Sequence, residues 1–156
     1  MLLVLFILAL ASMLLIRVPV IYGIDEEGEV LLKKRVSPGD ELISEYVHSV
    51  EKCPMKERFK VNHNLDILLK ESWNCNFGAG IESSLPEGTT GSFENGYYKI
   101  KGINQQFNEI QFHPVAIAKQ RLMVRNKTWD LYKEPFEGRT FTLKTGRMSL
   151  AEYLLK

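Results

Sequence analysis

The sequence has few cysteines, no excess of charge of either sign and no internal repeat. Cys53 and Cys75 are its two cysteines, and no C-x-x-C pair occurs, so a structural zinc site has no support. The strand-like segments are not separated by helical periods of about 12 residues, which argues against a doubly wound α/β fold. At 156 residues and 45% hydrophobic content, the chain fits one globular domain and is not of a disordered type.

Basic and acidic residues are nearly balanced, with 20 Lys and Arg against 19 Asp and Glu. Arg17 is the one charged residue before Asp25, so the segment 25–156 has no formal net charge. Domains that bind nucleic acids usually carry a basic excess or a basic stripe. We therefore expect no nucleic-acid partner.

Hydrophobic residues are concentrated at the amino terminus. Residues 1–16 contain Ser12 as their only polar member, and an apolar stretch resumes after Arg17. A helix over residues 1–24 would be about 36 Å long, enough for the roughly 30 Å of bilayer hydrocarbon. We predict one N-terminal transmembrane helix, an uncleaved membrane anchor at 1–24, followed by a domain at 25–156. A signal sequence remains the alternative, although the A-x-A at residues 9–11 would leave a very short signal.

Short alternating segments separated by turn residues follow the anchor and predict an all-β fold. The predicted strands are Glu29–Arg35, Leu42–Val50, Glu57–Val61, Leu65–Trp73, Tyr97–Lys101, Asn108–His113, Gln120–Arg125, Thr128–Leu131 and Arg139–Thr145. Five glycines in residues 76–96 indicate a loop. Ser149 and Glu152 form a capping-box pattern that predicts a short terminal helix. This spacing predicts an antiparallel β-sandwich or small barrel of about eight short strands.

Two segments carry a family resemblance: YVHSVEKCP at 46–54 and KESWNCNFGAG at 70–80. With Arg121-Leu122 and Trp129-Asp130-Leu131 further on, the sequence resembles the domain of unknown function 1850 over roughly residues 25–145. That family consists of small exported or membrane-anchored bacterial proteins encoded beside TAXI-type TRAP transporters, with no established activity. Cys53 stands where the family pattern more often has threonine.

The resemblance implies a single-pass cell-membrane protein whose C-terminal domain is extracytoplasmic. It also implies a non-enzymatic docking or ligand-handling role beside a TRAP transporter, with the membrane subunit or the solute receptor as partner. The charge count points the other way. Arg17 and residues 33–35 supply basic charge on the carboxyl side of the apolar run and none precedes it, which favours a cytoplasmic domain. We give the resemblance more weight than this count.

The two segments also contain the candidate functional residues. His48 and Ser49 are neighbours on a predicted strand, so their side chains point to opposite faces, which argues against a Ser–His nucleophile pair. We assign no catalytic residue, metal or cofactor. If His48, Glu51 and Glu71 converged on one pocket, a small-ligand or metal-binding module, or an enzyme, would become the better interpretation. The candidate binding residues are His48, Ser49, Glu51, Glu71, Ser72, Phe77, Gly78, Gly80 and Arg121.

The cysteines and the glycine-rich segment lie next to these residues. In an exported domain Cys53 and Cys75 can form a disulfide, with a loop-closure contribution of about 3 kcal/mol. In the cytoplasm, two reduced thiols are expected instead. The backbone of residues 77–80 is suited either to an anion-binding nest or to a tight turn with Phe77 in the core.

Overall fold

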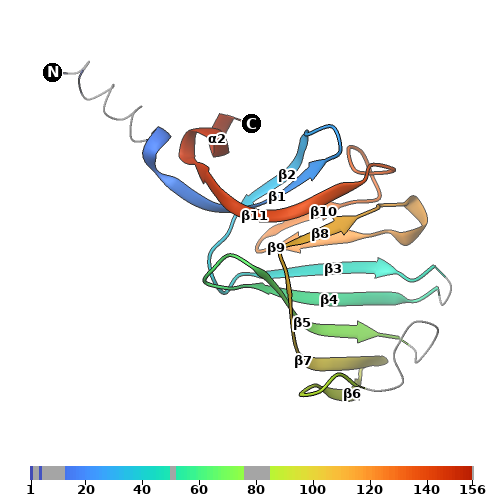
Figure 1. The fold of residues 1–156 in the computed structure, drawn as a ribbon. Helices are drawn as coiled ribbons and strands as arrows, with labels where there is room; N and C mark the ends of the chain where they lie inside the picture. The colour runs from blue at the N-terminus through green and yellow to red at the C-terminus, as the bar shows by residue number, and fades with distance from the viewer. Residues whose placement is uncertain (2–3, 5–12, 50–51, 76–84, 156) are drawn as a thin grey trace.

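The computed structural model describes residues 1, 4, 13–49, 52–75 and 85–155, which form two antiparallel β-sheets (Figure 1). The smaller sheet has the strand order β2-β1-β11-β8 and the larger one the order β10-β9-β3-β4-β5-β7-β6. The smaller sheet consists of β1 (Arg17–Asp25), β2 (Val30–Arg35), β8 (Glu109–Phe112) and β11 (Phe141–Ser149). The larger sheet consists of β3 (Glu41–Val47), β4 (Pro54–Val61), β5 (Ile67–Asn74), β6 (Thr90–Glu94), β7 (Tyr97–Phe107), β9 (Arg121–Val124) and β10 (Lys127–Asp130).

The apolar faces of the two sheets pack on each other and form one core. Phe141 of β11 stacks on Phe112 of β8, with 5.2 Å between ring centroids. The buried cluster joins both sheets and consists of Ile21, Leu32, Val36, Leu42, Phe59, Val61, Leu65, Ile67, Leu69, Phe112, Leu122, Val124, Leu131, Phe136, Phe141 and Leu143. The predicted all-β antiparallel sandwich is therefore confirmed for the described residues, with eleven strands there in place of about eight.

The N-terminal transmembrane helix of the fold prediction is wrong. Residues 17–25 form β1, which pairs with β2 on one side and β11 on the other. Val18, Val20 and Ile21 are at most 4% exposed, so these apolar side chains fill protein interior and are not available to lipid. The physical reason is the pairing with β2 and β11, which buries these residues in the protein. Pro19, which cannot donate a helical hydrogen bond, and its β-branched neighbours are compatible with this strand. Among the described residues, no helix is both long and apolar enough to cross a membrane. Residues 2–3 and 5–12 of the predicted anchor lie outside the described part.

The predicted capping box is present at the start of the last helix. Helix α2 (Leu150–Leu155) begins where the Glu152 carboxylate accepts a hydrogen bond from the Ser149 amide at 2.7 Å. In return the Glu152 amide donates to the Ser149 hydroxyl at 3.1 Å. At the other end of α2, the Lys33 ammonium donates to the carbonyl oxygen of Tyr153 at 2.6 Å. These contacts fix α2 against β2 and the end of β11.

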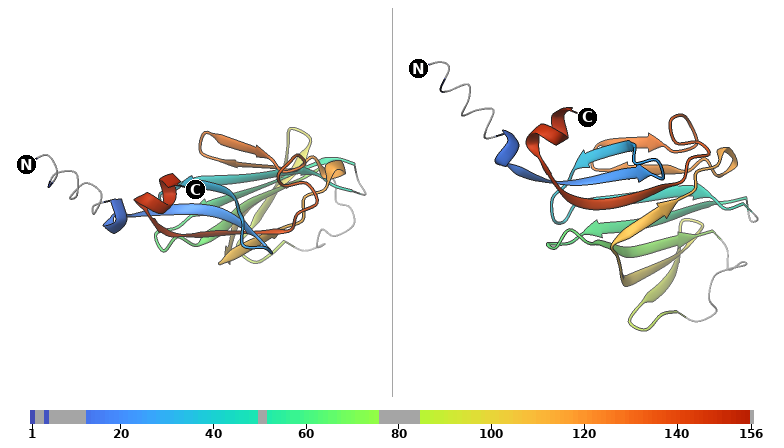
Figure 2. Two further views of the ribbon diagram at one scale, coloured as in Figure 1. Left: turned by 90° about the horizontal axis from the view of Figure 1, so that it is seen from above. Right: turned by 45° about the horizontal axis from the view of Figure 1, so that its top comes forward.

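The termini and the candidate segments lie at opposite ends of the strands. The start of β1 and α2 lie together at one end, whereas β3 ends and β4 begins at the other (Figure 2). The amide of Leu150 donates to the carbonyl of Ile16 at 2.9 Å, which joins the first and last strands at the terminal end. The fold therefore places α2 and the start of β1 at the opposite end of the strands from His48 and the two cysteines.

Candidate functional site

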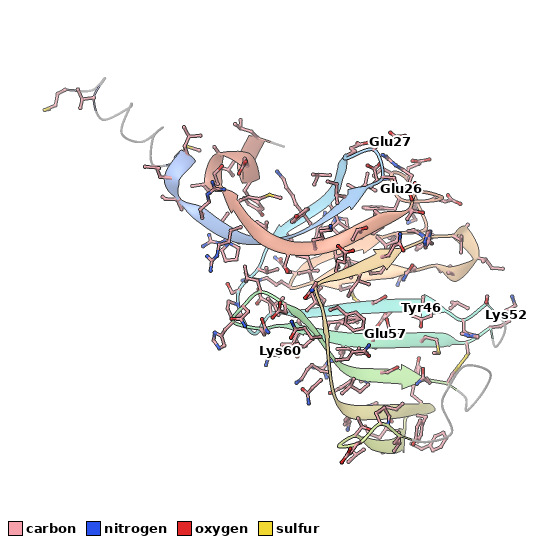
Figure 3. The ribbon with its side chains drawn as sticks, in the orientation of Figure 1. Glu26, Glu27, Tyr46, Lys52, Glu57 and Lys60 are labelled. Atoms are coloured by element: carbon pink, nitrogen blue, oxygen red, sulfur yellow. A yellow bond between two sulfur atoms is a disulfide. The ribbon has the colours of Figure 1, made fainter. Side chains whose placement is uncertain are left out.

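The predicted disulfide is present and ties two neighbouring strands of the larger sheet. Cys53 directly precedes β4 and Cys75 directly follows β5. Their Cα atoms are 6.2 Å apart, within the usual range for a disulfide, and 22 residues separate them in sequence. The yellow sulfur bond lies near Lys52 in Figure 3, at the end of the sheet where β3 stops. This bond fixes the end of the sheet that carries His48.

His48 and Ser49 follow β3 at the same end. The amide of His48 donates to the carbonyl of Cys53 at 2.8 Å, and the amide of Lys52 donates to the carbonyl of His48 at 2.9 Å. His48 is half-buried, whereas Ser49 is exposed. The chain around His48 is thus a tight connection held by its own backbone and by the adjacent disulfide.

The structure does not bring His48 and Glu71 together. Val47 pairs with Pro54, whereas Glu71 pairs with Arg58, four residues further along β4. At about 3.3 Å per residue, this places Glu71 on the order of 13 Å from the row next to His48. Glu51 and residues 76–84, which include Phe77, Gly78 and Gly80, lie outside the described residues.

A bulge in β5 decides which face Glu71 occupies. Phe59 pairs with Leu69, but the next residue of β4, Arg58, pairs with Glu71, so Lys70 is an extra residue in β5. Without it, strict alternation would put Glu71 on the core side with Leu69. With it, Glu71 lies on the face away from the smaller sheet, and its neighbour Ser72 lies on the inner face. The two predicted site residues therefore do not share a surface.

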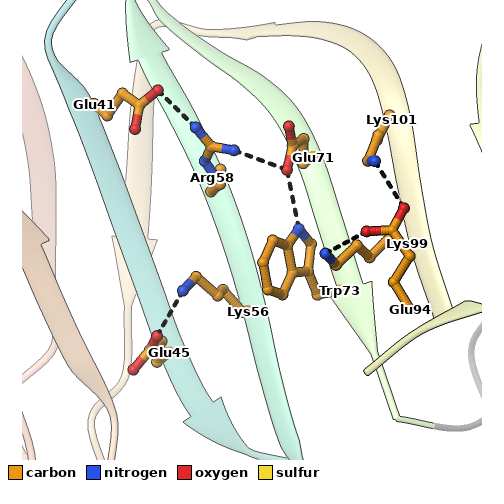
Figure 4. Close-up of polar contacts among 9 residues, drawn as sticks. All are labelled: Glu41, Glu45, Lys56, Arg58, Glu71, Trp73, Glu94, Lys99 and Lys101. Atoms are coloured by element: carbon orange, nitrogen blue, oxygen red, sulfur yellow. Dashed lines mark hydrogen bonds and ion pairs between the residues drawn. The ribbon is translucent and has the colours of Figure 1, made fainter. Parts of the chain in front are cut away.

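Glu71 is the centre of a hydrogen-bonded group on the outer face. Arg58 donates to the Glu71 carboxylate at 3.0 Å, and the Trp73 indole N–H donates to the same oxygen at 3.0 Å (Figure 4). A second Arg58 nitrogen donates to Glu41 at 2.7 Å. Partial burial alone would raise the pKa of Glu71, but the hydrogen bonds from Trp73 and Arg58 lower it below the usual value. The carboxylate is therefore held ionised.

Trp73 lies between two lysines. The Lys99 ammonium is 3.9 Å from the centroid of the Trp73 ring, and the Lys56 ammonium is 4.8 Å from it. Lys99 is only 7% exposed, and its charge is neutralised by an ion pair in which its ammonium lies 2.7 Å from the Glu94 carboxylate. Hydrogen bonds from Lys99, Lys101 and a nearby serine lower the pKa of Glu94 to about 2. The tryptophan is thus fixed by cation–π contacts and by its indole hydrogen bond.

These side chains form one continuous surface on β3, β4, β5, β6 and β7, which we call the outer charged face. It consists of Glu41, Glu45, Lys56, Arg58, Glu71, Trp73, Glu94, Lys99 and Lys101. Cations and anions alternate across it, so each charge has a neighbour of opposite sign. Of these residues, only Glu71 was a candidate from the sequence. The missed signal was the alternation Lys56, Arg58, Lys60 on one strand.

The inner face of the same sheet carries a second group of polar residues. Tyr46 pairs with Met55 and Ser44 with Glu57, so Tyr46 and Glu57 are diagonal neighbours on the same side of the sheet (Figure 3). Ser44 is 1% exposed, and Gln120 donates to its hydroxyl at 3.4 Å. Burial raises the pKa of the Glu57 carboxyl. Burial and the nearby Glu57 together raise the pKa of Tyr46 to about 12.

The raised pKa of Tyr46 gives a testable pH dependence. An unfolded tyrosine ionises near pH 10, whereas folded Tyr46 keeps its proton up to about pH 12. Its contribution to stability is therefore complete below pH 10 and is lost as the pH rises through 12. In an ultraviolet titration, we expect a tyrosine with a pKa near 12 that is missing in Tyr46→Phe. Identical titration curves for the two proteins would contradict the burial of this hydroxyl.

The remaining candidates do not extend either group. Arg121 is exposed on β9 and pairs with Asp130 at 3.2 Å. Within the described part of the chain, no group of three or more His, Cys, Asp or Glu residues is placed to hold a metal ion. The candidate functional surfaces are therefore the two faces of the larger sheet. The outer charged face has a more extensive network of polar contacts than the inner group around Tyr46 and Glu57.

Comparison with known proteins places this sheet in a family. The family model described as "Domain of unknown function (DUF1850)" matches residues 43–131. The chain belongs to the DUF1850 family. The match is shorter than the 25–145 expected from the sequence, and it runs from within β3 to the residue after β10. It thus covers the larger sheet from Ile43 onward, including the disulfide and the outer charged face apart from Glu41, together with β8. No curated protein and no solved structure matches this DUF1850 chain.

Proposed function

We propose that this DUF1850 protein is an extracytoplasmic, non-enzymatic accessory protein of a TRAP-type solute transporter. In this proposal it binds the membrane subunit or the solute receptor of the transporter through the outer charged face. The link to a transporter rests on what the family resemblance implies. The choice of surface rests on the geometry of the larger sheet.

One observation carries the choice of surface: Trp73 and Arg58 are both fixed by hydrogen bonds to Glu71 at 3.0 Å. Tryptophan and arginine are the residues most often found at the energetic centres of protein interfaces. Side chains already fixed before binding lose less conformational freedom when a partner docks. This face is directed away from the smaller sheet, so it is open to a partner.

The disulfide supports an extracytoplasmic location. Disulfides persist in oxidising compartments and are rare in the cytoplasm, where thiols are kept reduced. The Cys53–Cys75 bond joins the ends of the two strands that carry Arg58 and Trp73. Oxidation on export would therefore fix the register of the docking strands.

Ligand handling, metal binding or enzymatic activity through His48, Glu51 and Glu71 is less well supported. The row next to His48 and the row of Glu71 are four positions apart along β4. The Glu71 carboxylate is also already hydrogen-bonded by Arg58 and Trp73. Partner docking uses these contacts as they stand, whereas a ligand or metal at Glu71 would have to displace them.

Affinity capture tests the proposal in membranes that contain the transporter. Tagged full-length protein, solubilised in mild detergent, is expected to retain the membrane subunit or the solute receptor. Trp73→Ala and Arg58→Ala are each expected to weaken binding by about thirtyfold, which corresponds to about 2 kcal/mol for a residue at the centre of an interface. Lys119→Ala is the control, because Lys119 is exposed and lies outside the strands of the larger sheet. Equal capture by all variants, or no capture by the wild type, would reject this role.

A further inference from the structure

We propose that the end of the domain formed by α2 and residues 14–16 is a contact surface for an anionic lipid bilayer. This inference is independent of the docking face, which lies on the other sheet. Exposed apolar side chains gather at this end. Leu154 and Leu155 of α2 are 58% and 83% exposed, and Leu15 is 79% exposed. The hydrogen bond from Leu150 to Ile16 joins the two segments, so these leucines belong to one region.

The exposed apolar side chains of α2 have no space left beneath the helix. The face of β1 under α2 is already filled, since Val18 and Val20 are at most 4% exposed. The contact between Lys33 and the carbonyl of Tyr153 fixes the last turn of α2. Leu154 and Leu155 are therefore presented to the surroundings by a fixed helix, at the cost of exposing apolar surface to water.

Basic residues surround this apolar region. Arg17 begins β1, and Arg147, Arg35 and Lys34 lie opposite Pro19, Val20 and Ile21 of the same strand. Four cations thus lie within the first five residue rows of the smaller sheet, about 16 Å of strand. Glu152, which pairs with Arg17 at 3.8 Å, is the acidic residue of α2.

Exposed leucines next to an excess of cations are the pattern of a surface that binds anionic lipid headgroups while its apolar side chains enter the interface. A second copy of the chain would be a poorer fit, because it would bring the same cations together. With α2 against the bilayer, the disulfide end of the larger sheet would be directed away from the membrane. The strands run between these two ends (Figure 1).

The test uses full-length protein with an environment-sensitive fluorophore on Leu155→Cys, the native cysteines being joined in the disulfide. Ile117→Cys is the matched control, because Ile117 is 62% exposed on a different part of the molecule. With vesicles containing phosphatidylglycerol, we expect a blue shift of emission at position 155 and none at position 117. Replacing both Arg35 and Lys34 by glutamine is expected to weaken binding to these vesicles by about thirtyfold, at about 1 kcal/mol per basic residue.

Three outcomes would overturn the proposal. The first is an equal response at positions 155 and 117, and the second is a response at 155 that is the same with purely zwitterionic vesicles. The third is a blue shift at 155 without vesicles that increases with protein concentration, which would assign the surface to a second copy. Because the probe reports the surroundings of α2 itself, membrane binding through the disulfide end of the molecule cannot produce the expected result.

Discussion

Replacing both cysteines by serine (Cys53→Ser with Cys75→Ser) is expected to lower the free energy of unfolding by about 3 kcal/mol. The disulfide closes a segment with a sequence separation of 22 residues, which contains all of β4 and β5. Removing it gives the unfolded chain more conformations, so the folded state becomes relatively less stable. Urea denaturation of the oxidised wild type and of the double variant measures the difference.

The control for this experiment is the wild type in reductant, which should unfold at the same urea concentration as the double variant. A double variant as stable as the oxidised protein would show that the bond adds nothing to the sheet. Free thiols in protein purified without reductant would contradict the disulfide itself. That result would also remove the support that the disulfide gives to an extracytoplasmic location.

Phe141→Ala is expected to destabilise the protein by about 4 kcal/mol, as large-to-small changes of buried aromatic residues do. Phe141 is 1% exposed and lies 5.2 Å from Phe112 and 5.8 Å from Phe136 between ring centroids. Its ring also fills the space next to Gly23, where an added Cβ would lie 2.9 Å from it.

Val115→Ala is the matched control for the core substitution, because Val115 is 49% exposed. We expect its effect to stay within about 0.5 kcal/mol. Thermal denaturation followed by circular dichroism compares the two variants. Equal effects would mean that Phe141 does not lie in a packed core between the two sheets.

Several predicted elements were recognisable because their signals are local. The predicted neighbouring strands Glu57–Val61 and Leu65–Trp73 correspond to β4 and β5, and the structure pairs these strands. Ser149 and Glu152 predicted the start of α2, and their reciprocal hydrogen bonds are present. Each signal depends on residues at most a few positions apart, so no knowledge of the tertiary structure was required.

The elements that sequence reasoning missed depend on contacts distant in sequence. β1 was assigned to a lipid-spanning helix because its apolar residues fit lipid and protein core equally well. Only pairing with β11, about 125 residues later, distinguishes the two. β6 was read as loop because of glycines such as Gly91. Gly91 lies under the Tyr98 ring of β7, where an added Cβ would clash with the tyrosine.

The outer charged face could not be predicted from the sequence either. Alternation alone would place Glu71 with Leu69, and the extra residue Lys70 reverses this. A one-residue bulge has no reliable signature in a single sequence. The disulfide and Glu71 could be proposed from residue type, but the contacts of Arg58 with Glu71 and of Lys99 with Trp73 depend on strand order and register.

Site-specific photo-crosslinking tests the central claim most directly, because it reports contact in intact cells that express the transporter. The probe replaces Lys101, which is half-exposed at the margin of the outer charged face, and the control probe replaces Ile117. We expect a crosslink from position 101 to the membrane subunit or the solute receptor, lost in Trp73→Ala, and none from position 117. Crosslinking that is equal from both positions, or absent from position 101, would contradict docking through this face.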